Sequence, residues 1–143
     1  MKKLAYSSLT YTVFGLIAGL FYREFPRMIE ATPETVGASQ LSVVHTHSFT
    51  LGTFFFLFVL VLTKIFHLNA HKHFKKFYTT YHIGLGITVL TMLAHGIYVT
   101  LGNEPHAAFS GIAGLGHIIL TVAFGFFFYV LIQSIDQDSK TVE

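Results

Sequence analysis

The sequence predicts an all-α integral membrane protein, a single four-helix bundle that occupies the whole chain. Of its 143 residues, 52% are hydrophobic and only 11% are charged, and the mean hydropathy is +0.60. So few charged residues cannot cover a soluble domain of this size. Because a helix needs roughly 20 apolar residues to cross a hydrocarbon core of about 30 Å, the long apolar runs give the number of spans.

Four apolar runs meet this length requirement, at about residues 4–22, 41–66, 78–101 and 111–135, so residues 1–143 are expected to form one transmembrane domain. The first run follows Met1-Lys2-Lys3, as in a secretory signal. It is too long for the apolar segment of a signal peptide, and Arg23-Glu24-Phe25-Pro26 follows it in place of a small-residue cleavage site. We therefore expect it to remain as a helix.

The lysines predict the orientation of the helices. They precede the first run, surround the loop after the second run and follow the fourth: Lys2, Lys3, Lys64, Lys72, Lys75, Lys76 and Lys140. The only lysine or arginine residues in the other loops are Arg23 and Arg27. By the positive-inside rule, both termini and the 67–76 loop are cytoplasmic, and residues 23–40 form an ordered or partly ordered loop on the outer side.

The histidines are the candidate functional residues, because the chain has nine of them and no cysteine, so a metal must be bound by nitrogen or oxygen. His45 and His47 lie about 6 to 9 Å from the outer end of the second run, and His95 and His117 lie about 9 Å from the outer ends of the third and fourth. Three helices thus carry imidazoles at one level. Ionisable groups inside spans usually mark functional sites, although hydrogen bonds between helices are the alternative.

The spacing of His45 and His47 indicates two separate ligand positions. At about 100° per residue, positions i and i+2 point to nearly opposite sides of a helix. Imidazole suits iron, copper and zinc, and without a carboxylate at this level the site favours a cofactor that balances its own charge. A b-type heme meets these demands, and we expect Arg23 and Arg27 to bind its propionates. For these arginines, ordinary anchoring at the membrane interface is the alternative.

Two further features concern the helices themselves. The first run is rich in hydroxyl groups, which predicts that it faces other helices or a wet cavity. His82 lies near the cytoplasmic end of the third run, away from the other intramembrane histidines. We expect it to be an interfacial residue or to form a hydrogen bond with a neighbouring helix.

The stretch His45-Thr46-His47-Ser48-Phe49-Thr50-Leu51-Gly52 resembles the H-x-H-S-x-x-L-G motif in the tenth helix of heme-copper oxidase catalytic subunits, most closely the C-type cytochrome oxidases. In that family one histidine of the pair ligates the low-spin heme and the other ligates the high-spin heme. The family fold has twelve helices in three arcs of four. The resemblance implies that this chain is one arc, that a homotrimer rebuilds the twelve-helix arrangement, and that His45 of one protomer and His47 of the next hold one heme iron.

The chain is also similar to small four-helix membrane proteins of bacteria, which implies the bacterial cytoplasmic membrane. It departs from the oxidase pattern at the copper site. The oxidases hold copper with three histidines, two of them adjacent, whereas His95 has no neighbouring histidine. We therefore do not expect oxygen reduction at a heme-copper centre. No nucleophile with its base, no paired carboxylates and no nucleic-acid-binding surface are evident in the sequence.

Several arrangements of the histidines remain open at this point. A monomer with heme between His47 and either His95 or His117 is simpler than a trimer. His95 and His117 are also candidates for a second copper or zinc site. The leading expectation is a heme protein that transfers electrons to an unidentified redox partner or responds to redox state or small gases. The alternative is a copper or zinc binding protein or transporter that uses His45, His47, His95 and His117, and a structural membrane protein without heme is third.

Overall fold

The structure is a computed structural model that describes the backbone of residues 1–142 and the side chains of residues 1–137. Four helical segments in this range are long and apolar enough to cross a membrane, as predicted. They are α1 (Lys2–Met28), the continuous rod of α3 (Leu41–His47), η1 (Ser48–Phe54) and α4 (Phe55–Phe66), α5 (Phe74–Thr100), and α6 (Ala107–Val142). Two short helices, α2 (Pro33–Ala38) and η2 (Leu68–Ala70), lie in the connections.

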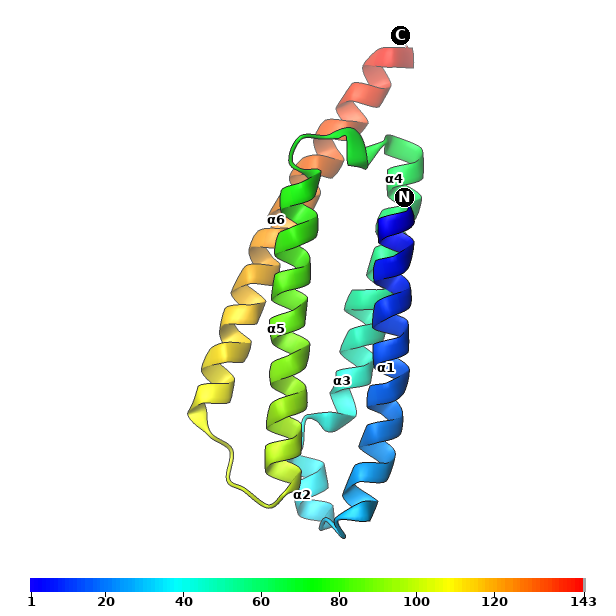
Figure 1. The fold of residues 1–143 in the computed structure, drawn as a ribbon. Coiled ribbons are helices and arrows are strands. Elements are labelled where there is room, and N and C mark those ends of the chain that lie inside the picture. The colour runs from blue at the N-terminus through cyan, green and yellow to red at the C-terminus, as the bar shows by residue number, and fades with distance from the viewer. Residues whose placement is uncertain (143) are drawn as a thin grey trace.

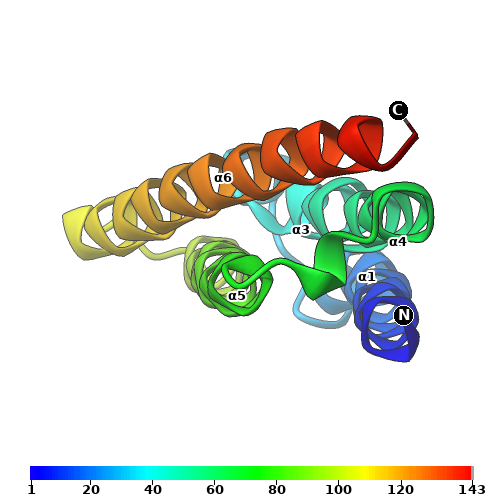
Figure 2. The same cartoon turned by 90° about the horizontal axis from the view of Figure 1, so that it is seen from above.

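The four segments run alternately in opposite directions (Figure 1). The N-terminus, the 67–73 connection and the C-terminal end of α6 lie at one end of the bundle, which we call the lysine end. Helix α2 and the 101–106 connection lie at the other, which we call the α2 end. Viewed along the bundle, α1 lies beside α3 and α4, and α6 runs obliquely past α5 toward α4 (Figure 2). The cytoplasmic placement of the lysine end remains a prediction.

The prediction of a loop from residue 23 is wrong for its first part, because α1 continues to Met28 and includes Pro26. A proline within a helix removes one backbone hydrogen bond. Here the turn that follows is still closed, since the Ile29 and Ala31 N–H groups donate to the carbonyls of Phe25 and Pro26 at 3.3 and 2.9 Å. The other connections are also shorter than predicted, because α5 begins at Phe74 and α6 at Ala107.

Helix α2 forms because its first residues supply the usual N-terminal signals. The Thr32 side chain accepts a hydrogen bond from the Thr35 N–H at 3.3 Å, and Pro33 occupies the first turn. This short helix follows the end of α1, where Glu30 adopts a positive φ of 52°. The connection after α1 is therefore ordered, as the sequence suggested, but part of it is helical.

A π-helix, η1, begins directly after His47 and widens the second span. At this point α1 lies close to the widened segment, and a side chain at Gly52 would collide with Tyr11. The Ser8 hydroxyl donates to the Thr53 carbonyl at 3.1 Å, and the hydroxyls of Thr12 and Thr53 are 2.9 Å apart. These contacts confirm that hydroxyl groups of the first helix face another helix. Single π-turns inside helices are frequent at functional sites.

The core contains a cluster of aromatic side chains toward the lysine end. Phe56, Phe77 and Tyr81 are fully buried, and the ring of Phe55 stacks on Tyr81 with centroids 4.4 Å apart. Helices α5 and α6 pack closely in the same region, because a Cβ atom at Gly84 would lie 2.8 Å from a backbone nitrogen of α6. This packing holds the lysine half of the bundle together.

Candidate functional site

His45 and His47 lie on the last turn of α3, directly before η1, and have different surroundings. The ring of His45 stacks on Tyr22 of α1, with centroids 6.5 Å apart and planes 19° apart. Its Cβ atom lies opposite Gly19, where an added Cβ would be 3.8 Å away. His47 is half-exposed and forms a hydrogen bond within its own helix. The two side chains thus diverge, as positions two residues apart on a helix should.

The hydrogen bond of His47 determines which of its nitrogens is available to a ligand. Its Nδ1 lies 2.9 Å from the Val43 carbonyl oxygen. Because a carbonyl can only accept, Nδ1 carries the proton and Nε2 keeps its lone pair. Metal-binding histidines are commonly oriented in this way, with the other ring nitrogen donating to a backbone carbonyl. This bond fixes the orientation of the His47 ring and directs Nε2 away from the Val43 carbonyl.

His117 on α6 repeats this arrangement. Its Nδ1 lies 2.8 Å from the carbonyl oxygen of Ala113, four residues earlier, and the side chain is exposed. The same reasoning leaves Nε2 of His117 free for coordination. Two of the four predicted ligands are thus oriented alike and face outward from the bundle.

His45 and His95 differ from this pair, because each has a buried Nδ1 with no hydrogen-bond partner among the described residues. The Nε2 of His45 lies 3.5 Å from the Thr46 hydroxyl, at the limit of a hydrogen bond. The ring of His95 contacts Phe109 edge to face, with centroids 5.2 Å apart. Since buried polar atoms are normally hydrogen-bonded, both rings lie in surroundings that do not satisfy them.

The structure does not bring the predicted ligands together at one point, and it does not place them all at one level. Gly116, beside His117, packs against Thr88, seven residues before His95 on α5, so His117 lies about 10 Å nearer the lysine end than His95. Within the described part of the chain, no group of three or more histidine or carboxylate side chains is arranged to hold a metal ion. His45 faces α1, His95 faces the start of α6, and His117 is exposed. A site in a single copy that uses all four histidines would therefore require rearrangement.

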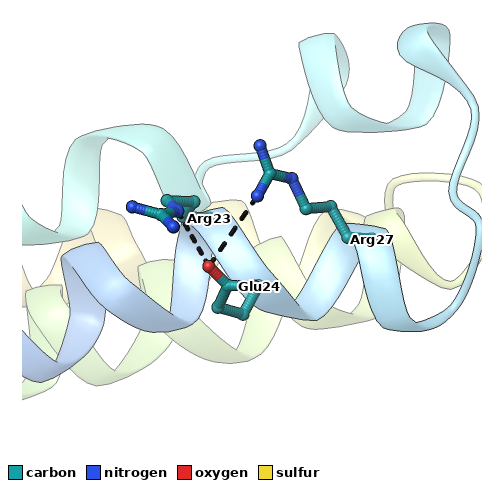
Figure 3. A network of polar contacts seen from close by, with 3 residues as sticks. All are labelled: Arg23, Glu24 and Arg27. Carbon is teal, nitrogen blue, oxygen red and sulfur yellow. Dashed lines mark ion pairs between the residues drawn. The ribbon is translucent and has the colours of Figure 1, made fainter.

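Arg23 and Arg27 lie on the last turns of α1 rather than in a loop, and both pair with Glu24 (Figure 3). The Arg23 Nε and Arg27 Nη1 atoms are 2.8 and 3.9 Å from the same carboxylate oxygen. The arginine side chains are 68% and 69% exposed, so these pairs are weak and exchangeable. Both arginines line a hollow of about 830 Å³ at the α2 end, beside Tyr22 and Ser42.

A second polar site lies near the lysine end, between α1 and α5. Both ring nitrogens of His82 are engaged, Nδ1 with Tyr11 Oη at 3.0 Å and Nε2 with Ser7 Oγ at 3.1 Å. Tyr78 Oη lies 2.8 Å from the same Ser7 Oγ. These bonds confirm that His82 is linked to a neighbouring helix. Sequence reasoning missed the other members, although the i, i+4 pairs Ser7/Tyr11 and Tyr78/His82 were a signal that each helix presents two polar groups on one face.

Comparison with known proteins gives a family but no activity. A family model described as "Protein of unknown function (DUF2871)" matches residues 1–134. No curated protein and no solved structure matches the chain. These comparisons do not test the expected resemblance to heme-copper oxidases, which rests on the eight-residue motif, the helix number and the position of the motif. Since the family model covers almost the whole chain, the protein belongs to the DUF2871 family.

Proposed function

We propose that the protein binds a b-type heme near the α2 end of the bundle, with His47 Nε2 as one axial ligand. The observation that carries this proposal is the Nδ1–H bond of His47 to the Val43 carbonyl at 2.9 Å, which orients the ring and leaves Nε2 available to a ligand. Bound heme would supply one-electron chemistry, which suits electron transfer or a response to redox state or small gases.

The sparse donor set favours heme over a bare metal ion. A copper or zinc ion bound by the protein alone needs three or four donors from side chains. The described residues bring no three such side chains together. A porphyrin supplies the equatorial nitrogens itself, so one or two imidazoles suffice.

The second axial ligand is proposed to come from a neighbouring copy in a homotrimer. His47 and His117 both present Nε2 on the outer surface of one copy, so a partner histidine must approach from outside. The oxidase-like motif favours His45 of the next protomer. In the structure that ring is stacked on Tyr22, and it would have to turn away from α1. His117 needs no such movement and is the competing second ligand.

Arg23 and Arg27 are proposed to bind the propionates. They lie at the α2 end and share the single Glu24 carboxylate, so a propionate could replace Glu24 at either guanidinium. Charge-assisted bonds from arginine to a carboxylate are among the stronger polar contacts. Because the arginines are largely exposed, this exchange requires little desolvation.

Absorption spectra of the purified protein test the proposal. We expect a red protein with sharp reduced bands and heme equimolar with protein. His47→Ala should lose the heme or convert it to a five-coordinate form that binds carbon monoxide. The matched control is His106→Ala, an exposed histidine of the outer connection whose ring accepts only from the Ala108 N–H, and it should retain the wild-type spectrum. A colourless protein, or an unchanged spectrum in His47→Ala, would contradict the assignment.

Native mass and two further variants test the second ligand and the assembly. A heme-loaded trimer that is disrupted by His45→Ala supports the motif-based pairing, whereas disruption by His117→Ala alone assigns the competing ligand. A heme-loaded monomer would refute the intersubunit site. Stoichiometric copper or zinc in a colourless protein would instead support the metal-binding alternative.

A further inference from the structure

A groove of about 470 Å³ lies between α1 and α5 in the lysine half of the bundle. This volume is in the range of small-molecule sites, about 300 to 1,000 Å³. Apolar side chains, among them Phe14, Val89 and Leu90, make up most of its lining. Its lining includes Tyr6 and Leu90, two residues that are 65% and 60% exposed. The groove therefore opens sideways, where the acyl chains of a surrounding membrane would lie.

One side of this groove carries the hydrogen-bonded chain Tyr11–His82–Ser7–Tyr78. The imidazole is held in place, because both of its nitrogens have partners and its ring stacks on Phe56 with centroids 4.7 Å apart. Ser7 Oγ also lies 2.9 Å from the Lys3 carbonyl oxygen, to which it can donate. The polar groups thus have fixed positions, while their protons can be arranged in more than one way.

Two proton arrangements fit the same heavy-atom positions. In the first, His82 carries its proton on Nε2 and donates to Ser7, while the Tyr11 hydroxyl donates to Nδ1 and offers only lone pairs to the groove. In the second, Nδ1 carries the proton and donates to Tyr11 Oη, and Ser7 donates to Nε2. The Tyr11 O–H is then free to donate into the groove. Tyr11 therefore presents either an acceptor or a donor to a ligand without movement of the chain.

We propose that this groove binds the ring of a lipid-soluble quinone and of the corresponding hydroquinone, with the Tyr11 hydroxyl as the hydrogen-bond partner. A quinone carbonyl only accepts hydrogen bonds, whereas a hydroquinone hydroxyl donates one, and the tautomers of His82 match both. The flat ring and apolar tail suit the apolar walls and the lateral opening. A phospholipid acyl chain would use none of the polar groups. The proposal does not depend on heme binding, because none of the groove residues is assigned to the heme.

The chain offers a variant that fills the groove without disturbing the packing. An added Cβ at Gly86, which lines the groove, has no atom within 4 Å, so Gly86→Phe extends into open space. Gly125 on α6 is equally open and lies outside the groove, so Gly125→Phe is its matched control. Tyr11→Phe removes only the hydroxyl, and Tyr98→Phe, near the α2 end of α5, is its control.

Binding is measured with full-length protein in phospholipid nanodiscs, using a short-chain menaquinone in oxidised form and, under anaerobic conditions, in reduced form. Bound quinone is extracted and quantified against empty nanodiscs of the same lipid. We expect saturable binding by wild type and by both controls, and only background binding by Gly86→Phe. Tyr11→Phe should weaken binding of both redox forms about tenfold, as expected for one lost hydrogen bond.

Circular dichroism and thermal unfolding of each variant show whether it is folded. If Gly86→Phe does not fold, the nearly isosteric Tyr11→Phe decides the outcome. Background binding by wild type, or equal binding by wild type and Tyr11→Phe, overturns the proposal. So does wild-type binding by folded Gly86→Phe, or phospholipid in place of quinone in the occupied groove.

Discussion

Replacement of Gly52 by alanine tests the close approach of α1 to the π-helix. In Gly52→Ala, the new Cβ would collide with the base of the Tyr11 side chain, and the ring atom Cδ1 would lie only 2.8 Å away, against 3.4 to 4 Å in ordinary contact. The atoms at the base of a side chain cannot swing aside as a flexible end can. Helix α1 must therefore move away from η1.

The size of the effect follows from what this movement disturbs. Overpacking in a closely packed interior destabilises by about 1–3 kcal/mol. The movement also weakens the hydrogen bonds of Ser8 and Thr12 to Thr53, each contributing about 0.6 kcal/mol in membrane proteins. We expect Gly52→Ala to lower the free energy of unfolding by about 2–4 kcal/mol.

The assay is reversible unfolding in mixed micelles of increasing sodium dodecyl sulfate, followed by circular dichroism. Gly125→Ala is the control, because its Cβ meets open space, and it should be neutral or stabilise by up to about 1 kcal/mol. In the double variant with Tyr11→Gly, every side-chain atom that the new Cβ would meet is absent, so the two changes should be non-additive by more than about 1 kcal/mol. Wild-type stability of Gly52→Ala, or simple additivity in the double variant, would refute the close approach.

Three further predictions concern other parts of the chain. Ser39→Ala should lower the free energy of unfolding in the same assay by about 1–3 kcal/mol, because it removes a buried hydroxyl with three hydrogen bonds. The Ser39 Oγ donates to the Gly96 carbonyl at 3.0 Å and accepts from the Thr100 hydroxyl at 2.9 Å and the Leu41 N–H at 3.2 Å. Unchanged stability would show that other groups replace these bonds. Glu24→Gln should change that free energy by less than about 1 kcal/mol, since its ion pairs with Arg23 and Arg27 are exposed, and a larger loss would indicate a structural role for the pairs. Partial burial of His73, followed by the charges of Lys76 and Lys72 and by His71, lowers the pKa of its imidazole below the usual value of 6.5. The folded state therefore favours the neutral ring. The resulting contribution of His73 to the free energy of unfolding is fully present above pH 6.5 and is lost as the pH falls through the lowered pKa. Histidine NMR titration should show this shift, and Lys76→Gln should reduce it; a pKa of His73 at or above 6.5 would contradict the stated causes.

The histidine motif illustrates how far local sequence can lead. The divergence of His45 and His47 follows from helix geometry alone, and the structure agrees with it. The hydrogen-bond partners of the His45 and His47 rings could not be predicted from helix geometry in the same way. Whether Nδ1 meets a carbonyl, as in His47, or remains buried without a described partner, as in His45, depends on which neighbouring helix covers that side.

The end of α1 shows where local signals mislead. Pro26 and the charges of residues 23–27 are typical of a loop, and we predicted one. The helix nevertheless continues to Met28, because the backbone groups after Pro26 find partners one turn away. A single proline weakens a helix by a limited amount, and neighbouring packing decides whether the helix ends there.

The sequence by itself determined the four spans, because twenty apolar residues can satisfy their backbone polar groups within a membrane only as a helix, and this requirement acts on each segment separately. It also determined that both termini lie at one end, since an even number of antiparallel spans returns the chain to the side where it began. Only the tertiary structure decided that Ser7, Tyr11, Tyr78 and His82 form one hydrogen-bonded chain. Ser7 is separated from Tyr78 by 71 positions and from His82 by 75. The contact between the two pairs of residues depends on how α1 and α5 are packed and rotated about their own axes. The packing of each helix against its other neighbours sets that rotation, as Gly52 of η1 does against Tyr11 of α1 and Gly84 of α5 does against α6. No periodic pattern within one helix records these contacts.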